Sequence, residues 1–154
     1  MSSALALVQN IIPAMSEKAI NSVCKLEDIT LSCPQVDIHT HHTIHAGIYA
    51  RTIMVPAGVV LTGAPIRLAT ILILNGHTKI FTGEDTIELR GYHVIAASAN
   101  RKQAVLAIED TYFTMLFPTS VKTVKEAEDE FTDEPERLIS RLNPDLNHIT
   151  ITGE

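Results

Sequence analysis

Short alternating runs of apolar and polar residues, separated by turn signals, fill the middle of the chain. Alternation with a period of two is typical of strands that bury one face, and turns about every 8–12 residues are typical of β-sandwiches and barrels. Asn75-Gly76 predicts a two-residue hairpin turn. The predicted strands are Ile48–Val55, Val59–Thr62, Ile66–Leu74, His77–Phe81, Thr86–Leu89, Tyr92–Ala97, Gln103–Ile108 and Thr111–Phe117.

The beginning of the chain has a helical pattern instead. Apolar residues recur there at steps of three and four, which places them on one helix face: Leu5, Val8, Ile12 and Met15. Pro13 interrupts this pattern and divides it into two short helices. A second helix is predicted over Ser16–Val23, with Ser16 as its N-cap. The stretch Asp28–Val36 is expected to be a connector or a short strand.

The end of the chain is also predicted to be helical. Thr123–Glu126 has the residue types of a capping box, and Asp133–Glu136 combines an acidic cap with a proline in the first turn. His148–Thr152 alternates and could form a short strand or an ordered extension. We therefore divide the chain into an N-terminal segment (1–35), a β-barrel (36–119) and acidic C-terminal helices with a tail (120–154).

Composition and charge restrict the classes of function. The chain has 154 residues, 45% of them hydrophobic and 19% charged, which suits one folded domain and excludes a disordered chain. The formal net charge of −6 argues against direct binding to nucleic acid or to an anionic membrane. Most of the excess acid lies in residues 122–154, as is typical of solvated helix faces.

Cys24 and Cys33 are too few for a disulfide framework, which indicates a reducing compartment. The apolar run Ala4–Val8 lacks the basic residues and the cleavage pattern of a signal peptide. The longest apolar stretch, Ala69–Leu74, is far shorter than the ~20 residues of a membrane helix. We therefore expect a soluble cytoplasmic protein.

Four histidines lie close together in the sequence, namely His39, His41, His42 and His45. In an extended segment His39, His41 and His45 would share one side, and His42 would face the other. Imidazoles at alternate strand positions can hold a divalent transition metal, so the cluster is a candidate metal site. The alternative is a polar segment whose histidines are solvated or bonded to backbone.

Several cations lie within or beside predicted strands. An arginine in such a place has to reach solvent, a carboxylate or a ligand, because an unpaired buried charge is costly. Positive side chains in a concave site suit an anionic ligand. The candidate ligand-binding residues are Tyr49, Arg51, Arg67, His93, Arg101 and Lys102. The sequence contains no glycine-rich phosphate loop and no motif of a serine hydrolase or zinc protease.

Several pieces of the chain between Val36 and Leu142 together resemble the small single-domain cupins, and more narrowly the cupin-like proteins of bacteriophages and prophages. These pieces are His45–Thr52, Pro56–Gly63, Gly91–Val94, Arg101–Gln103, Thr114–Thr119 and Glu126–Glu134. The resemblance implies a cupin-like jelly-roll β-barrel with short N-terminal and C-terminal helices. Where metal-binding cupins carry their ligands, Ala64–Thr70 contains neither a histidine nor a carboxylate.

We therefore expect a non-enzymatic phage or prophage protein that binds a small anionic ligand in the barrel, such as a nucleotide signal, without a cofactor. A homo-oligomer is expected through the apolar face of Leu5, Val8 and Ile12, and a phage or host protein is a further candidate partner. One alternative is a structural component of the virion. Another is a metal-dependent cupin enzyme that uses the four clustered histidines. A third is an epimerase-like barrel with Tyr49 and His93 as acid and base.

Overall fold

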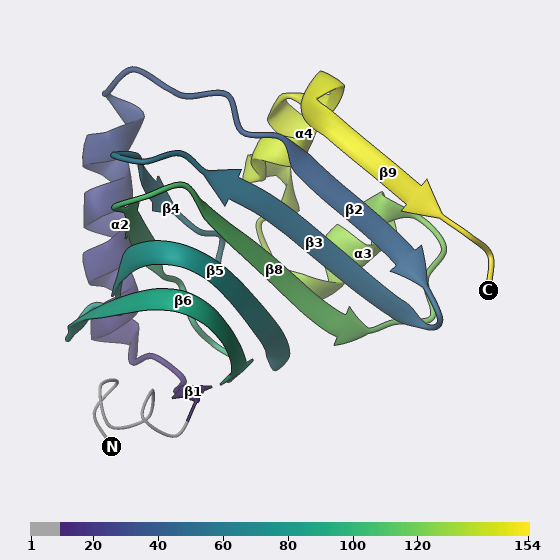
Figure 1. Cartoon of the computed structure of the whole chain (residues 1–154), viewed down its shortest axis with the longest axis horizontal. Coiled ribbons are helices and arrows are strands. Elements are labelled where there is room, and N and C mark those ends of the chain that lie inside the picture. The colour runs from purple at the N-terminus through teal and green to yellow at the C-terminus, as the bar shows by residue number, and fades with distance from the viewer. Residues whose placement is uncertain (1–9) are drawn as a thin grey trace.

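The computed structural model describes residues 10–154, in which nine strands form one continuous, curved sheet (Figure 1). The strands are β1 (Ile11–Ile12), β2 (Thr40–His45), β3 (Ile48–Val55), β4 (Val60–Thr62), β5 (Thr70–Phe81), β6 (Thr86–Ala97), β7 (Ala104–Ala107), β8 (Thr111–Pro118) and β9 (Asn147–Ile151). The helices are α2 (Glu17–Leu31), α3 (Val124–Phe131) and α4 (Ile139–Leu142), with 3₁₀ turns η1 (Pro135–Arg137) and η2 (Pro144–Leu146). The prediction of a mainly β fold with short helices near both ends is confirmed.

The sheet is rolled but does not close into a barrel, which corrects the sequence-based expectation. Its main path runs β1-β6-β5-β8-β3-β2-β9, and β4 joins it through β7, which pairs with the second half of β5. In the described part of the chain this path ends at β1, β9 and β4, each with one partner strand. Closure would need these edges to pair with one another.

The long ribbon of β5 and β6 supplies the curvature. Asn75-Gly76 is not a hairpin turn, because it lies inside β5, a strand of twelve residues that continues to Phe81. Gly76 has a φ of 149° and lies opposite Gly91, whose φ is 91°. Backbone in this region favours glycine, so both strands bend here instead of ending. Each pair of short strands predicted on either side of these glycines is therefore one long strand.

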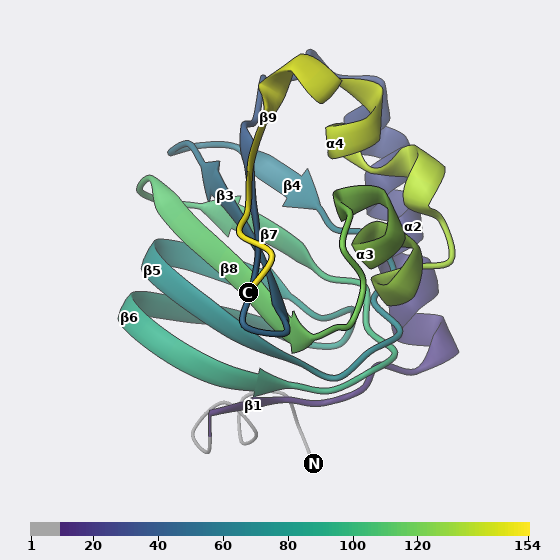
Figure 2. The ribbon, with the colours of Figure 1, turned by 90° about the vertical axis from the view of Figure 1, so that its right-hand side faces the viewer.

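The helices lie together on one side of the curved sheet (Figure 2). Ser16 caps α2 as predicted, because its Oγ accepts a hydrogen bond from the Ala19 amide at 3.1 Å. This helix continues to Leu31, so the connector expected from Asp28 begins four residues later, at Ser32. The N-cap of α3 is confirmed, since Thr123 Oγ1 accepts from the Glu126 amide at 3.3 Å, while the Glu126 carboxylate accepts from the Thr123 hydroxyl at 2.7 Å.

The first predicted helix is corrected where the structure describes it. Ile12 belongs to β1, which pairs in parallel with β6, and its side chain is buried. Leu5 and Val8 lie outside the described residues. The last predicted segment forms β9, which pairs in parallel with β2. No helix within residues 10–154 has both the length and the hydropathy needed to cross a membrane.

The core lies on the concave face of the sheet. One cluster joins α3 to β3 and β8, where Tyr49, Phe117 and Phe131 pack together with ring centroids 5.4–6.4 Å apart. A second cluster of aliphatic residues, with Phe113, lies between β5, β7 and β8. Burial of the apolar side chains in these two clusters is the main favourable contribution to folding. The space between the two clusters is only partly filled.

Candidate binding cavity

A cavity of about 960 Å³ lies inside the roll. Its walls come from the concave sides of β3, β5, β7 and β8, from β4, and from the C-terminal end of α2, the segment 33–38 and α4. Cavities of roughly 300–1,000 Å³ are the size at which proteins bind small molecules. The sequence predicted a concave site in the roll, and the structure contains one.

The deep part of the cavity is apolar. Inward-pointing residues at alternate strand positions form its wall, among them Ile53, Leu72, Ile80, Val105, Phe113 and Met115. Its rim is also apolar, because Leu31, Val36, Val60 and Leu142 line the cavity and are 43–66% exposed. Large apolar side chains around an opening are unusual on a free surface and mark binding sites.

Arg51 lies at one end of the cavity and is held by acceptors from β3 and the C-terminal helices. Its Nη1 donates to Glu128 Oε2 at 2.9 Å and to the Tyr49 hydroxyl at 3.2 Å, and its Nη2 donates to Ser140 Oγ at 2.9 Å. The guanidinium carbon lies 5.4 Å from the centre of the Phe131 ring. Arg141 supplies a second cation to Glu128 at 3.0 Å. The positive charge of Arg51 in the cavity wall is therefore already balanced by the Glu128 carboxylate.

Tyr49 and His42 extend this network behind the wall. Asn147 donates through Nδ2 to the Ser140 carbonyl, so its Oδ1 faces His42 Nε2 at 3.0 Å. His42 Nε2 therefore carries the proton, and Nδ1 accepts from the Tyr49 hydroxyl at 2.7 Å. Burial lowers the pKa of His42 and raises the pKa of Tyr49. Both side chains are neutral hydrogen-bonding groups at neutral pH.

A second ion-pair network lies where α2 meets the roll. Both carboxylate oxygens of Glu27 contact Lys102 Nζ, at 3.1 and 3.2 Å. Glu27 also accepts from Arg137 Nη2 at 2.8 Å and from Thr62 Oγ1 at 3.0 Å. Lys102 is 2% exposed, so its charge is sustainable only with this partner. This network ties α2, β4 and η1 together across the cavity.

Arg101 differs from the other cations of the wall, because no carboxylate of the described residues lies within ion-pair distance. Its guanidinium donates to the carbonyls of Leu68 and Ser98 at 3.2 and 2.6 Å, and to Thr70 Oγ1 at 2.7 Å. Burial lowers the pKa of Arg101 to about 10, so it stays charged at neutral pH. Gln103, also on the wall, has a buried Nε2 without a hydrogen-bond partner in the structure.

The other predicted ligand-binding residues lie away from the cavity. Arg67 forms an ion pair with Asp133 and donates to backbone carbonyls at the end of α3. His93 Nε2 contacts the Arg90 carbonyl at 2.8 Å. The structure therefore brings Arg51, Arg101 and Lys102 to one wall, with Tyr49 behind them.

The four clustered histidines occupy β2 and its approach, but the structure does not bring them together. His42 faces the core, whereas His41 and His45 are exposed on the opposite face, as alternation predicted. His39 Nδ1 lies 2.8 Å from His148 Nε2, and His41 stacks on His148. Within residues 10–154, no group of three or more His, Cys, Asp or Glu is placed to hold a metal ion. The metal site stays a prediction from the sequence.

Glu27, Arg137 and Gln103 are wall residues that sequence reasoning did not select. Glu27 was assigned no partner because α2 was expected to end at Val23. The apolar spacing of Ala19, Val23 and Leu26 continues the helix past that point and was the available signal. Arg137 reaches the wall only through the long-range contact of η1 with α2, which no local pattern encodes.

No known family model matches the sequence, and no curated protein is similar to it. Solved structures with a similar fold include a cupin superfamily protein from Desulfitobacterium hafniense, at 12% identity and a TM-score of 0.46 over 58% of this chain and 84% of that one. An RmlC-like cupin family protein from Methanocaldococcus jannaschii has 11% identity and a TM-score of 0.45, over 57% and 85%.

KdgF from Halomonas is similar at 17% identity and a TM-score of 0.45, over 57% of this chain and 86% of that one. These likenesses concern the fold alone.

Proposed function

We propose that this protein binds a small molecule in the cavity of the roll, and that the molecule is mainly apolar with one anionic group. The observation that carries the proposal is the cavity of about 960 Å³ with apolar walls and an apolar rim. A filled core would leave no such space, because protein interiors pack at the density of organic crystals. The role is binding, without a chemical step.

The apolar part of the ligand is argued from the wall. Ile53, Leu72 and Phe113 present hydrocarbon to the cavity, so burial of ligand hydrocarbon against them is favourable by about 25 cal/mol per Å². Polar ligand atoms placed there would lose their water without gaining a partner.

The anionic group is argued from the cations. Arg51 and Lys102 already face Glu128 and Glu27, so a ligand anion beside them would meet a neutralised pair. Among the described residues Arg101 has no such acid, and it is the cation best placed to gain from an anion. One unpaired cation suits a single carboxylate better than the several phosphate charges of a nucleotide.

Binding rather than catalysis is supported by how Glu27, Lys102 and Arg51 of the wall are engaged. General acid–base chemistry needs a group that is free to exchange a proton with the ligand. Glu27 and Lys102 instead hold one another, and Arg51 is held by Glu128 and Ser140.

Two matched probes test the proposal, namely decanoate and 1-decanol, which share a chain and differ in charge. Isothermal titration calorimetry of the purified full chain should show saturable binding of both, with decanoate the tighter. Equal affinities would contradict the anionic part of the proposal. Absence of binding by either probe would contradict the cavity as a ligand site. AMP in the same titration tests the nucleotide predicted from the sequence.

A cavity variant assigns the binding to this site. Val105→Phe adds volume to the wall and should weaken binding of both probes by roughly tenfold or more, because the new ring occupies the space that either probe would fill. Ile29→Phe is the matched control, since Ile29 is exposed on α2 and does not line the cavity. Equal affinities in the two variants would place the probes elsewhere.

The phage or prophage origin and the assembly role stay predictions from the sequence resemblance. They concern where the protein works and which macromolecules it meets, and the cavity is compatible with either.

A further inference from the structure

The convex face of the sheet, opposite the cavity, is broad, and no helix of residues 10–154 covers it. Six neighbouring strands contribute to it in the order β6-β5-β8-β3-β2-β9 (Figure 1). Strand alternation turns every second residue outward, as the burial patterns of β2 and β8 show. We define the outer sheet face by its outward residues, strand by strand. They are Tyr92, Val94 and Ala96 of β6; Ile71, Ile73 and Asn75 of β5; Tyr112, Thr114 and Leu116 of β8; Ile48, Ala50, Thr52 and Met54 of β3; His41, Thr43 and His45 of β2; and His148 and Thr150 of β9.

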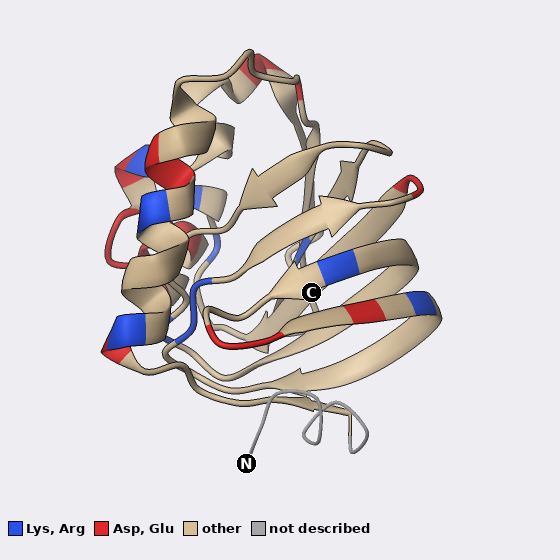
Figure 3. Ribbon diagram, turned by 90° about the vertical axis from the view of Figure 1, so that its left-hand side faces the viewer, with Lys and Arg blue, Asp and Glu red and all other residues tan. Residues whose placement is uncertain are grey.

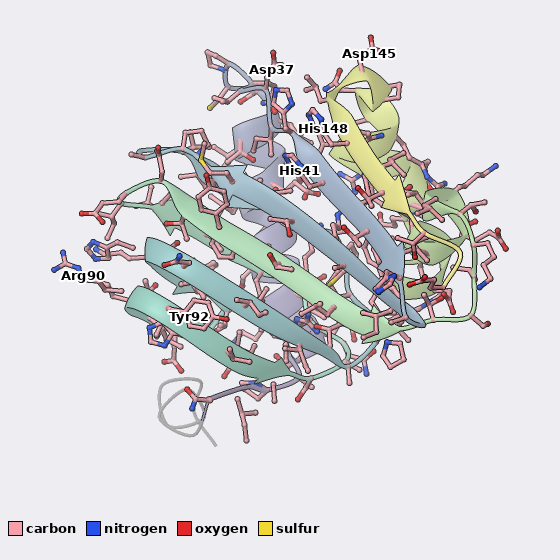
Figure 4. All side chains as sticks on the ribbon, turned by 45° about the vertical axis from the view of Figure 1, so that its right-hand side comes forward. Asp37, His41, Arg90, Tyr92, Asp145 and His148 are labelled. Carbon is pink, nitrogen blue, oxygen red and sulfur yellow. The ribbon has the colours of Figure 1, made fainter. Side chains whose placement is uncertain are left out.

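The outer sheet face contains no Asp, Glu, Lys or Arg. Solvated faces of antiparallel sheets normally carry polar and charged side chains, and this chain has enough of them, with 19% charged residues. Figure 3 shows charged residues along α2, in the loops near it and on parts of two strands; Lys79 of β5 and Glu88 and Arg90 of β6 lie outside the outer sheet face as defined. In Figure 4, Tyr92 and His41 lie on the outer sheet face, whereas Arg90 and Asp145 lie beyond its ends.

Large apolar side chains are exposed on this face instead. Ile71, Tyr92, Val94 and Tyr112 are 48–65% exposed, and they come from the three neighbouring strands β5, β6 and β8. Thr52 and Thr114 satisfy each other across β3 and β8, with their hydroxyls 2.7 Å apart. These two hydroxyls are thus already paired, and their desolvation costs little.

The size of the face matches that of a protein interface. At ordinary spacings of about 4.8 Å between strands and about 6.7 Å between outward residues, six strands with on average three outward residues cover roughly 600 Å² in projection. Side-chain relief raises the accessible area above this value, toward the roughly 800 Å² that each partner buries in a stable complex.

We propose that the outer sheet face is the contact surface of a homodimer, in which two copies pack face to face about a twofold axis. Copies of a chain with a net charge of −6 repel one another wherever their acids are exposed. No residue of this face carries a carboxylate, and Glu154 Oε2 lies 3.9 Å from His45 Nδ1 only at the end of β2, so two copies can approach through the middle of the face. A twofold axis also lets the same patch serve both sides. The dimer would be distinct from the sequence-based expectation of pairing through Leu5, Val8 and Ile12.

Sedimentation velocity of the full chain over a concentration series tests the dimer. The expected mass at the higher concentrations is twice the 16.9 kDa of one chain. Ile71→Lys and Tyr112→Glu, tested separately, should each raise the dimer dissociation constant by roughly a hundredfold, because each buries an unpaired charge in the contact. Both positions are about half exposed in one copy, so the fold should tolerate the charges, as circular dichroism would verify.

Ile29→Lys is the matched control, because Ile29 is 64% exposed on α2 and outside the outer sheet face. It should leave the dissociation constant unchanged. A wild-type chain that stays monomeric throughout the series would overturn the proposal, and that result would also leave the face to a different partner. A dimer that survives both face variants, or that Ile29→Lys disrupts equally, would place the contact elsewhere. None of these results depends on whether the cavity binds a ligand.

Discussion

At the scale of single residues, Glu128 connects the C-terminal helices to the sheet. It is 2% exposed and contacts Arg51 of β3, Ser140 of α4 and Arg141. Burial by itself would raise the pKa of Glu128, but hydrogen bonds from Ser140 and Arg141 and the charge of Arg51 lower it below its usual value. The carboxylate is therefore ionised at neutral pH, and its removal leaves Arg51 without its acid.

Glu128→Ala should lower the free energy of unfolding by about 3 kcal/mol, because it strands a largely buried guanidinium. Asp129→Ala is the control: its carboxylate also pairs with Arg141, but it is half exposed, so its loss should cost less than about 1 kcal/mol. Urea denaturation of both variants at neutral pH measures the difference. Similar losses would show that burial of the pair does not matter.

His42 makes stability depend on pH. Its folded pKa lies below 6.5, the ordinary value, because burial and the charge of Arg51 favour the neutral ring and outweigh the hydrogen bond with Asn147, which favours the charged one. Below pH 6.5 the unfolded chain therefore binds a proton that the folded chain does not. The stabilisation from His42 is complete above pH 6.5 and declines as the pH falls toward the folded pKa.

The expected slope from His42 is up to about 1.4 kcal/mol per pH unit. Urea midpoints measured between pH 7 and pH 5 should fall more steeply for the wild-type chain than for His42→Gln, which does not titrate. Parallel curves for the two chains would contradict the assignment of a neutral, buried imidazole. Glu128 adds to acid loss only at lower pH, where its carboxylate begins to take up a proton.

At the scale of elements, the bend in β5 and β6 determines the shape of the roll. A Cβ on residue 76 would lie 2.7 Å from the Thr111 Cα and 2.8 Å from the Asp110 carbonyl oxygen. The start of β8 therefore packs directly against the bare backbone of β5. The opposite glycine, Gly91, has open space around its Cα.

Gly76→Ala should cost at least about 2 kcal/mol more stability than Gly91→Ala. Both substitutions place alanine at a positive φ, but only the first also forces β5 and β8 apart. Thermal unfolding of the two variants measures this difference. Equal effects would show that conformational strain, rather than the close approach, explains the need for glycine at position 76.

The sequence predicted elements well where local signals decide them. Ile48–Val55 has the observed bounds, and the caps at Ser16 and Thr123 are correct. It failed at Asn75-Gly76, because a glycine needed for close packing has the same local signature as a hairpin turn. Open edges of the roll depend on which strands pair, and pairing is a long-range property.

The candidate site was predictable only in part for a similar reason. Arg51 was selected because a strand arginine needs a partner, and it has one in Glu128. Lys102 and Glu27 are 75 residues apart, so their pairing could not be read from spacing. Neither the volume of the cavity nor its apolar rim has a signal in the sequence, since both depend on the placement of α2 and α4.

At the scale of the whole molecule, the roll has two faces with different properties. The concave face contains the cavity and the buried ion pairs, and the outer sheet face carries no Asp, Glu, Lys or Arg and exposes large apolar side chains. A larger side chain on the concave face should therefore lower stability where the surrounding core is fully packed. Where it points into the cavity, it should lower ligand binding instead. Val105 and Val55 allow this comparison, because Val105 lines the cavity and Val55 is fully buried among core residues.

Val55→Phe should lower the free energy of unfolding by about 1–3 kcal/mol, because a packed core has no room for the ring. Val105→Phe should cost less than about 1 kcal/mol, since the ring can enter the cavity. Guanidinium denaturation of the ligand-free proteins tests this. A large loss for Val105→Phe would indicate that the space is too small to accept a side chain.

The parallel pairing of β9 with β2 has a consequence for synthesis of the protein. Asn147 bonds to His42 across 105 positions of the chain, so β2 leaves the ribosome long before the strand that covers it. Until then one edge of β2 offers unpaired amides and carbonyls to any neighbouring nascent chain. A message truncated after Leu146 would make that interval permanent, and its product should accumulate as aggregates rather than as a slightly shorter protein.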